Sequence, residues 1–565
     1  MKKLLSVFLS VLLVFAMLLT GCGPKDQPPE SDENGGISNA DGTYSVTSSY
    51  LPATLSAQMK TQFEGCEDES FTYATQKNAP FVIIDDLQIS DCKVKSITIP
   101  VWSTGRAEDG SFVFTLSVVK ADKINDLKDT MADPLKTYKI KIDASRYELE
   151  ESTLVRKFIQ VQLDTYDIEL KTNQTLAFGA PNDTIIPAII KTDVKKGSKN
   201  PAAKTFIDDW GIVGHYYLTP DENTFTVAQT SLLFDVAMER TYESKAAYEA
   251  LVAKKAQANA DYEAKLAAVK AVFEGKNISM MGDSISTHGT VTNNTSYNPT
   301  IGNNYVYAPH KEEGNSYHYS KVYWGRLATD LGMNLDVMNA WSGGRVYGRS
   351  DLNYVDNMLL RSYQLANTAG TDPDLVILYY GINDINNSPS SLYSVGQSLS
   401  PYSQSDATSD LYQKLQSKGT KTTIEVMDEW FTAVQQKATA AGYVRTDANP
   451  VIIPGTTYTS WEAAYALSLY NILNSYDNPE VYIMTLVETN HSSASNGKLD
   501  RANLMLRAFA EYFGVGLIDQ QEGYLNKANC HLYTYDTNGL HPNIQGHALM
   551  TKLIVETLYE DLNAQ

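Results

Sequence analysis

Four short groups of residues have the types that nucleophilic chemistry requires. A serine hydroxyl is a poor nucleophile until a base takes its proton, and a histidine is the usual base. Ser284 follows an apolar run at 278–281, and His541 lies within DTNGLHPN near the other end of the chain. Gly-Asp-Ser is also a common turn sequence. Whether Ser284 is a nucleophile or part of an ordinary turn therefore depends on the elements that surround it. The four groups are Gly282-Asp283-Ser284, Gly343-Gly344, Asn383 and His541.

The same groups could stabilise the negative charge of an acyl-transfer intermediate. Such an oxyanion needs hydrogen-bond donors that already point at it. We expect the donors to be the amide of Ser284, a glycine amide at 343 or 344, and the side chain of Asn383. Glycine suits the second position because no Cβ keeps the backbone from the substrate. The adjacent glycines leave two possibilities, of which Gly343 is preferred.

Strands and helices alternate after Gly275, and this pattern places the four groups. Segments typical of buried strands begin at 277, 334, 374, 479 and 515, and helical patterns separate them. Alternation of this kind predicts an α/β fold with a parallel sheet covered on both faces. Active sites in such sheets lie beyond the carboxyl ends of the strands. The serine, glycine, asparagine and histidine are therefore expected at one sheet edge.

In order and position the four groups resemble the SGNH hydrolases, also called GDSL esterases. The resemblance covers Lys276 to Gln565. It implies a three-layer fold and a serine ester hydrolase. Ser284 would be the nucleophile, His541 the base, and Gly343 or Gly344 and Asn383 the oxyanion donors.

The sequence departs from the family pattern in front of the histidine. The family usually has an aspartate three residues before it, where this chain has Asn538. Asp536 lies five residues before, so a longer loop could let it orient His541, and this is the preferred reading. Alternatively, Asn538 orients the histidine without charge, or a backbone carbonyl supports a Ser–His dyad.

The amino terminus reads as an export signal. Lys2 and Lys3 precede an apolar run at 4–19, which is short for a membrane span of about 20 residues. The run ends in LTGC and resembles a bacterial lipobox, which implies cleavage before Cys22 and lipidation of that cysteine. The protein is then extracytoplasmic and anchored to the cell membrane by lipid. A plain secretory signal or a short anchor helix is the alternative.

Changes in composition divide the chain into five parts. Short alternating strands without helices predict an antiparallel sandwich, which looks like the jelly rolls that accompany carbohydrate-active enzymes. It could bind sugar or act as a spacer. An Ala-, Lys- and Glu-rich stretch predicts one long helix. The parts are a signal peptide at 1–21, a flexible tether at 22–43, a β-sandwich at 44–236, a helical connector at 237–274 and the α/β domain at 275–565.

The composition and net charge limit the classes of molecule that the protein is expected to bind. A formal net charge of −20 over 565 residues disfavours nucleic acid, and a neutral substrate fits best. No cofactor and no metal are expected, and the oligomeric state is left open. Cys66 and Cys92 could pair or stay reduced. The residues predicted to contact substrate are Asp283, His288, Tyr305 and Asn538.

Together these features predict an extracellular serine esterase that removes acetyl or similar acyl groups, most plausibly from carbohydrate. The chain has 36 tyrosines, whose rings suit half-exposed recognition surfaces. A lipid esterase or thioesterase would use the same catalytic residues, but its substrate cleft would need apolar flanking loops, and the long loops here are polar. A non-catalytic, carbohydrate-binding surface protein is the third hypothesis, supported by Asn538.

Overall fold

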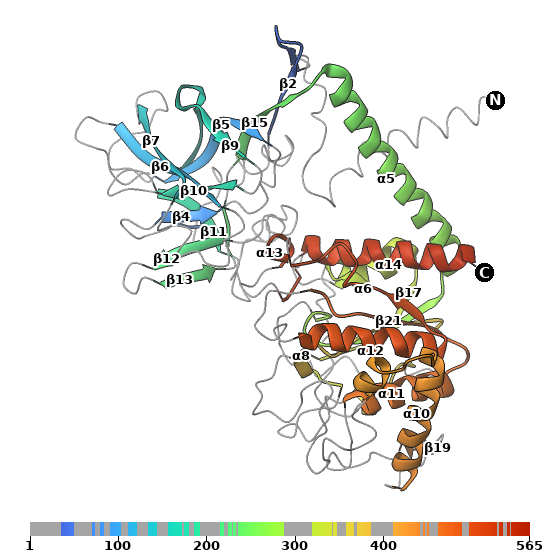
Figure 1. Ribbon diagram of the computed structural model, residues 1–565. Coiled ribbons are helices and arrows are strands. Elements are labelled where there is room, and N and C mark those ends of the chain that lie inside the picture. The colour runs from blue at the N-terminus through green and yellow to red at the C-terminus, as the bar shows by residue number, and fades with distance from the viewer. Residues whose placement is uncertain are drawn as a thin grey trace, which may run out of the picture. The chain divides into compact units, whose positions relative to one another are not determined.

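The computed structural model in Figure 1 divides into two compact units. The first comprises Met1–Ala260 with His531–Thr537, and the second comprises Asp261–Cys530 with Asn538–Gln565. The structure describes residues 36–49, 71–73, 80–83, 91–102, 111–120, 134–143, 156–171, 174–179, 186–191, 215–219, 224–228, 230–232, 235–287, 319–341, 343–346, 358–366, 370–385, 411–440, 445–446, 449–450, 461–488, 497–527, 530–534, 540–542 and 544–564.

The described strands of the first unit pair antiparallel in two sheets. The first sheet follows the path β1 (Ile37–Ser38), β2 (Tyr44–Ser49), β15 (Asp235–Tyr242), β5 (Cys92–Trp102), β11 (Ile186–Lys191) and β14 (Thr230–Leu232). Off this path, β3 (Phe71–Tyr73) pairs with β11, and β8 (Arg156–Gln162) and β9 (Ile168–Leu170) pair with β5. The second sheet has the order β13 (Thr224–Ala228), β12 (His215–Thr219), β4 (Pro80–Ile83), β10 (Gln174–Gly179), β6 (Ser111–Lys120) and β7 (Lys136–Asp143). The jelly-roll topology stays a prediction.

Alternation of side chains explains why these segments form strands. In β7 the side chains of Tyr138 and Ile140 are buried, whereas those of Lys139 and Lys141 are exposed, as the two faces of a pleated strand require. A short 3-10 turn, η3 (Asp164–Tyr166), links β8 to β9. Cys92 of β5 is a buried free thiol, and burial raises its pKa to about 11. Cys66 lies outside the described residues.

The long helix of the connector is present but begins later than the composition predicts. α5 spans Lys245–Phe273, whereas the predicted connector begins at 237. Residues up to Tyr242 belong to β15, which pairs with β2 on one side and β5 on the other. Pairing on both edges outweighs the helical propensity of this short stretch.

The second unit is built on a five-stranded parallel sheet, as the alternation of elements predicts. Its order is β17 (Asn334–Ala340), β16 (Asn277–Gly282), β18 (Leu375–Tyr379), β21 (Glu480–Met484) and β22 (Gly516–Ile518). Every residue of β18 is buried. Such continuous apolar strands are typical of sheets covered on both faces.

Helices form the two outer layers of this unit. In Figure 1, α6 (Tyr323–Leu331) and α14 (Ile544–Ala564) lie on one side of the strands, and α10 (Thr423–Ala440), α11 (Trp461–Ser475) and α12 (Lys498–Phe513) lie on the other. α11 is buried around most of its circumference, so it forms the centre of its layer. The short elements of this unit are η5 (Tyr319–Lys321), α7 (Met358–Arg361), α8 (Ile382–Ile385), α9 (Leu411–Gln416), β19 (Arg445–Thr446) and β20 (Asn449–Pro450). A further short helix, α13 (Cys530–Tyr533), has three of its four residues in the first unit.

Candidate active site

Three neighbouring strands end at the same level of the sheet. Gly282, the last residue of β16, pairs with Ala340 of β17 and with Tyr379 of β18. The chain then leaves all three strands at one edge, because the strands are parallel. The amide of Trp341 donates to the carbonyl of Gly282 at 2.9 Å, which extends the contact by one residue. The edge therefore brings together the first three of the four predicted groups.

A single tight turn presents Ser284. The carbonyl of Asp283 accepts from the amides of Ser286 and Thr287 at 3.1 and 3.2 Å. The carbonyl of Ser284 accepts from the Thr287 hydroxyl at 3.1 Å. These bonds fix the backbone on both sides of the serine, whose exposed fraction is 5%.

Gly282 is required by close packing under this turn. A Cβ at Gly282 would overlap with the Oγ and Cβ atoms of Ser286. Ser286 is itself anchored to α6, because its hydroxyl lies 2.9 Å from the Tyr323 hydroxyl and its carbonyl accepts from the Trp324 indole at 2.8 Å. All three of these side chains are fully buried.

His541 lies next to Ser284, the candidate nucleophile. Its Nε2 lies 2.9 Å from Oγ of Ser284, within the distance needed for direct proton transfer. For Nε2 to accept the serine proton, the neutral ring must carry its own proton on Nδ1. Asp536 and Asn538, the two predicted partners of that nitrogen, lie outside the described residues.

The glycine turn after β17 separates the two candidate amides. The amide of Gly344 donates to the Trp341 carbonyl at 2.8 Å, so it closes the turn. Gly343 has φ 76°, a left-handed conformation that favours glycine. Its amide and that of Ser284 have no acceptor within the described part of the chain. This geometry favours Gly343 over Gly344 as the oxyanion donor.

Asn383 and Asp384 tie the loops of this edge together. The side-chain nitrogen of Asn383 donates to the carbonyl of Gly344 at 3.0 Å. Oδ2 of the buried Asp384 accepts from the Val346 amide at 3.0 Å. Asp384 was not singled out from the sequence, although it follows Asn383 directly in YGIND. By accepting from the Val346 amide, the Asp384 carboxyl fixes the loop that carries Gly343.

Asp283 has a different place from the one predicted. Its side chain is fully buried, and Oδ1 accepts from the Ile285 amide at 3.0 Å. Burial raises the pKa of this carboxyl well above its usual range. These observations argue against contact with substrate, because a fully buried group cannot meet a ligand at the surface. His288 and Tyr305, also predicted to contact substrate, lie outside the described residues, as does Cys22.

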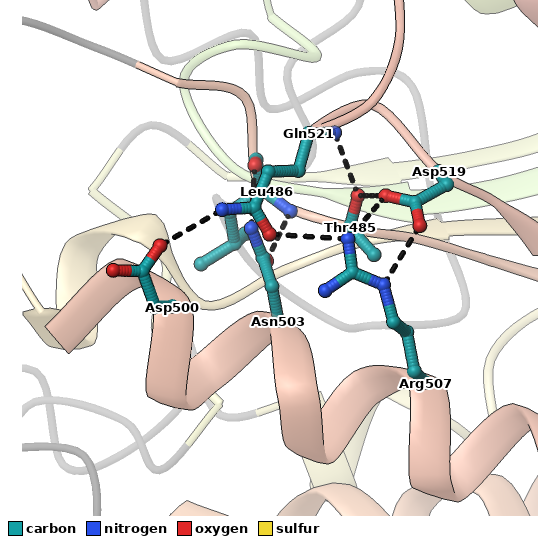
Figure 2. A network of polar contacts seen from close by, with 7 residues as sticks. All are labelled: Thr485, Leu486, Asp500, Asn503, Arg507, Asp519 and Gln521. Carbon is teal, nitrogen blue, oxygen red and sulfur yellow. Dashed lines mark hydrogen bonds and ion pairs between the residues drawn. The ribbon is translucent and has the colours of Figure 1, made fainter. Parts of the chain in front are cut away.

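A polar network, which the sequence did not reveal, holds the other half of the edge. Figure 2 shows three side chains of α12 reaching toward the ends of β21 and β22. Arg507 donates to both carboxylate oxygens of Asp519, at 2.7 and 2.9 Å. The Thr485 hydroxyl donates to the same carboxylate at 2.8 Å. The members are Thr485, Leu486, Asp500, Asn503, Arg507, Asp519 and Gln521.

The network supplies partners for backbone groups that leave the sheet. Asn503 accepts from the Leu486 amide at 2.8 Å and donates to its carbonyl at 3.0 Å. Buried backbone groups without partners are costly, so a helix side chain takes the place of a strand here. The described residues contain no group of three or more side chains suited to hold a metal ion. None of the described helices is both long and apolar enough to span a membrane.

Residues 280–549 match the model of the GDSL-like Lipase/Acylhydrolase family. The match begins inside β16 and ends inside α14, so it includes the nucleophile turn, both loops and His541. This family match supports the interpretation that the protein is an ester hydrolase. No curated protein matches the chain.

Several solved structures are similar at low identity. A GDSL-like lipase candidate from Bacteroides ovatus is 14% identical, covers 52% of this chain and 100% of its own, and has a TM-score of 0.27. A family two carbohydrate esterase from Clostridium thermocellum is 10% identical, covers 84% and 92%, and has a TM-score of 0.29. An acetyl xylan esterase, AlAXEase, is 14% identical, covers 51% and 99%, and has a TM-score of 0.23. These scores are too low to support a conclusion about this chain.

Proposed function

We propose that the second unit is a serine esterase in which Ser284 attacks the ester carbonyl and His541 is the base. The observation that carries the proposal is the 2.9 Å contact between Nε2 of His541 and Oγ of Ser284 at the carboxyl edge of a parallel sheet. The family match over the same residues supports it.

In the proposed mechanism, the proton of the Ser284 hydroxyl passes to Nε2 of His541 as Oγ bonds to the carbonyl carbon. The resulting oxyanion accepts hydrogen bonds from the amides of Ser284 and Gly343 and from Asn383. The imidazolium then protonates the leaving alcohol, and an acyl-enzyme remains. Water, deprotonated by the same histidine, attacks the acyl carbon; the bond to Oγ then breaks, the carboxylic acid leaves, and the imidazolium returns its proton to Oγ of Ser284.

We propose a small acyl group, acetyl above all, on a carbohydrate as the substrate. The support comes from the sequence. The insert that follows the nucleophile turn, at 288–318, is polar and contains several tyrosines. Tyrosine rings with polar tips suit wet, sugar-like ligands better than lipid chains. The net charge of −20 favours a neutral polymer over an acidic one.

We place the enzyme outside the cytoplasm, tethered to the cell membrane through lipid on Cys22. This proposal rests on the apolar run at 4–19 and the LTGC ending. Incorporation of labelled fatty acid into the wild type, and its loss in Cys22→Ala, would support the anchor. A Cys22→Ala chain that stays labelled and membrane-bound would contradict it.

The enzymatic proposal is tested by release of acetate from acetylated sugars and from p-nitrophenyl acetate. The wild type should be active, whereas Ser284→Ala should be silent. Ser417→Ala is the matched control, because Ser417 is exposed after α9 and, among the described residues, its hydroxyl donates to Gln413 of its own helix. Activity confined to long acyl chains would favour a lipid esterase. A wild type silent on all esters would overturn the hydrolase and favour a surface carbohydrate-binding protein.

A further inference from the structure

The side chain beneath the candidate nucleophile is a buried acid with an incomplete set of partners. Asp283 directly precedes Ser284, and its exposed fraction is 0%. Oδ1 accepts one hydrogen bond, from the amide of Ile285 at 3.0 Å. Oδ2 is buried as well and has no hydrogen-bond partner in the described structure. One neutral donor is too little to offset the burial of a carboxylate.

The groups that face Asp283 do not supply a balancing charge. Asp384 of α8 is a second carboxyl, and it disfavours a negative charge on Asp283. Tyr323 of α6 and Tyr379 of β18 are buried phenols that Asp283 influences in turn. His547 of α14 stacks on the ring of Tyr323, with 6.0 Å between the ring centres. In the described part of the chain, no ion pair joins Asp283 to a cation.

Protonation of Asp283 removes the buried charge that has no balancing partner. The protonated acid still accepts from the Ile285 amide through Oδ1, and no unpaired charge is then left buried on Oδ2. Burial is the main cause that raises the pKa of Asp283, and Asp384 raises it further, while the Ile285 amide lowers it. A carboxyl that stays neutral at neutral pH because its site is apolar is a known device in enzymes.

We propose that Asp283 is a positioning residue that shapes the Ser284 turn as an uncharged carboxylic acid. The inference rests on the proposed function, because it assigns a task within that active site. The acid orders the turn through the Ile285 amide. Its neutrality also keeps a negative charge away from the place where the oxyanion forms, next to the amide of Ser284. A carboxylate there would oppose the developing charge.

Two variants separate the shape of the side chain from its charge. Asp283→Asn keeps an oxygen for the Ile285 amide and is always neutral, so kcat should stay close to that of the wild type. Asp283→Ala removes the acceptor, and kcat should fall about tenfold with little change in KM. A kcat for Asp283→Asn as low as that for Asp283→Ala would overturn the proposal, because charge would then be required.

The pH dependence of folding tests the proton without using activity. The folded protein keeps a proton that the unfolded chain releases above pH 3.8, the ordinary pKa of the group. The wild type should therefore lose stability as pH rises from there toward the raised pKa of the folded state. Asp283→Asn has no such proton, so its denaturation midpoint should exceed that of the wild type by a margin that grows from acidic to neutral pH.

Glu511→Gln is the matched control, since Glu511 is exposed on α12. Its midpoint should follow that of the wild type at every pH. A constant difference between Asp283→Asn and the wild type would overturn the proposal. If no ester is hydrolysed by any of these proteins, the proposed function fails, while the midpoints still decide whether Asp283 is neutral.

Discussion

Substituting alanine for Gly282 should damage the nucleophile turn through one contact. The new Cβ would overlap with Oγ and Cβ of Ser286. Ser286 cannot simply move aside, because it is fully buried and its hydroxyl lies 2.9 Å from that of Tyr323. The overlap is thus resolved either by a shift of the turn or by loss of this hydrogen bond.

The size of the effect follows from these two costs. Overpacking a close-packed interior costs about 1–3 kcal/mol. Leaving the buried Tyr323 hydroxyl without a partner costs about 1–3 kcal/mol. A shift of the turn relieves part of the overlap and also weakens the hydrogen bond, so the two costs do not add in full. Gly282→Ala should therefore lower the free energy of unfolding by about 2–4 kcal/mol. A displacement of Ser284 by about 1 Å should lower kcat on the order of 100-fold.

Denaturant unfolding and ester hydrolysis measure both quantities, and a second substitution tests the cause. Ser286→Gly removes the obstructing atoms. The double variant Gly282→Ala/Ser286→Gly should therefore be more stable than the sum of the two single effects predicts, by about 1–2 kcal/mol. Strict additivity would show that the turn is not limited by this contact, and so would wild-type stability and kcat in Gly282→Ala.

Three further predictions concern the loops of the same edge. Asp384→Ala removes the acceptor of the Val346 amide, so kcat should fall about tenfold while KM changes little in steady-state kinetics; an altered KM alone would contradict this role. Gly343→Ala keeps the amide but imposes a Cβ at φ 76°, which costs about 1–2 kcal/mol and should shift the amide and lower kcat; a kcat near wild type would show that the turn does not need the left-handed conformation for catalysis. Arg507→Met breaks the two-pronged contact with Asp519 and should lower the free energy of unfolding by about 1–3 kcal/mol. The side chains are 31% and 26% exposed, so added salt should reduce this difference, and an unchanged midpoint would refute it.

The sequence predicted the fold correctly where the pattern of apolar residues and the order of strands and helices agree. The buried runs predicted the five parallel strands, and the rule about carboxyl ends predicted that the four groups would share one sheet edge. In the structure Gly282, Ala340 and Tyr379 do pair side by side at that edge. The spacing of Ser284 and His541 says nothing about their distance. Only the fold brings them to 2.9 Å across 257 positions.

Features that depend on three-dimensional neighbours could not be read in advance. The burial of Asp283 comes from α6, β18 and α8, which are remote in sequence, so a polar residue next to the nucleophile looked like a substrate contact. The choice between Gly343 and Gly344 depends on one bond to the Trp341 carbonyl. The start of α5 depends on strand pairing that continues to Tyr242.

The long separation between nucleophile and base has a consequence for synthesis. β16 is among the first elements of its unit to leave the ribosome, yet both of its neighbouring strands and the candidate base, His541, come later in the chain. The nascent polypeptide therefore carries Ser284 without its candidate base until His541 has been made. Contacts between such distant positions also form slowly. Under the proposed mechanism, ester hydrolysis would report that the whole second unit has folded, and a chain truncated before His541 would be inert even with a well-formed serine turn.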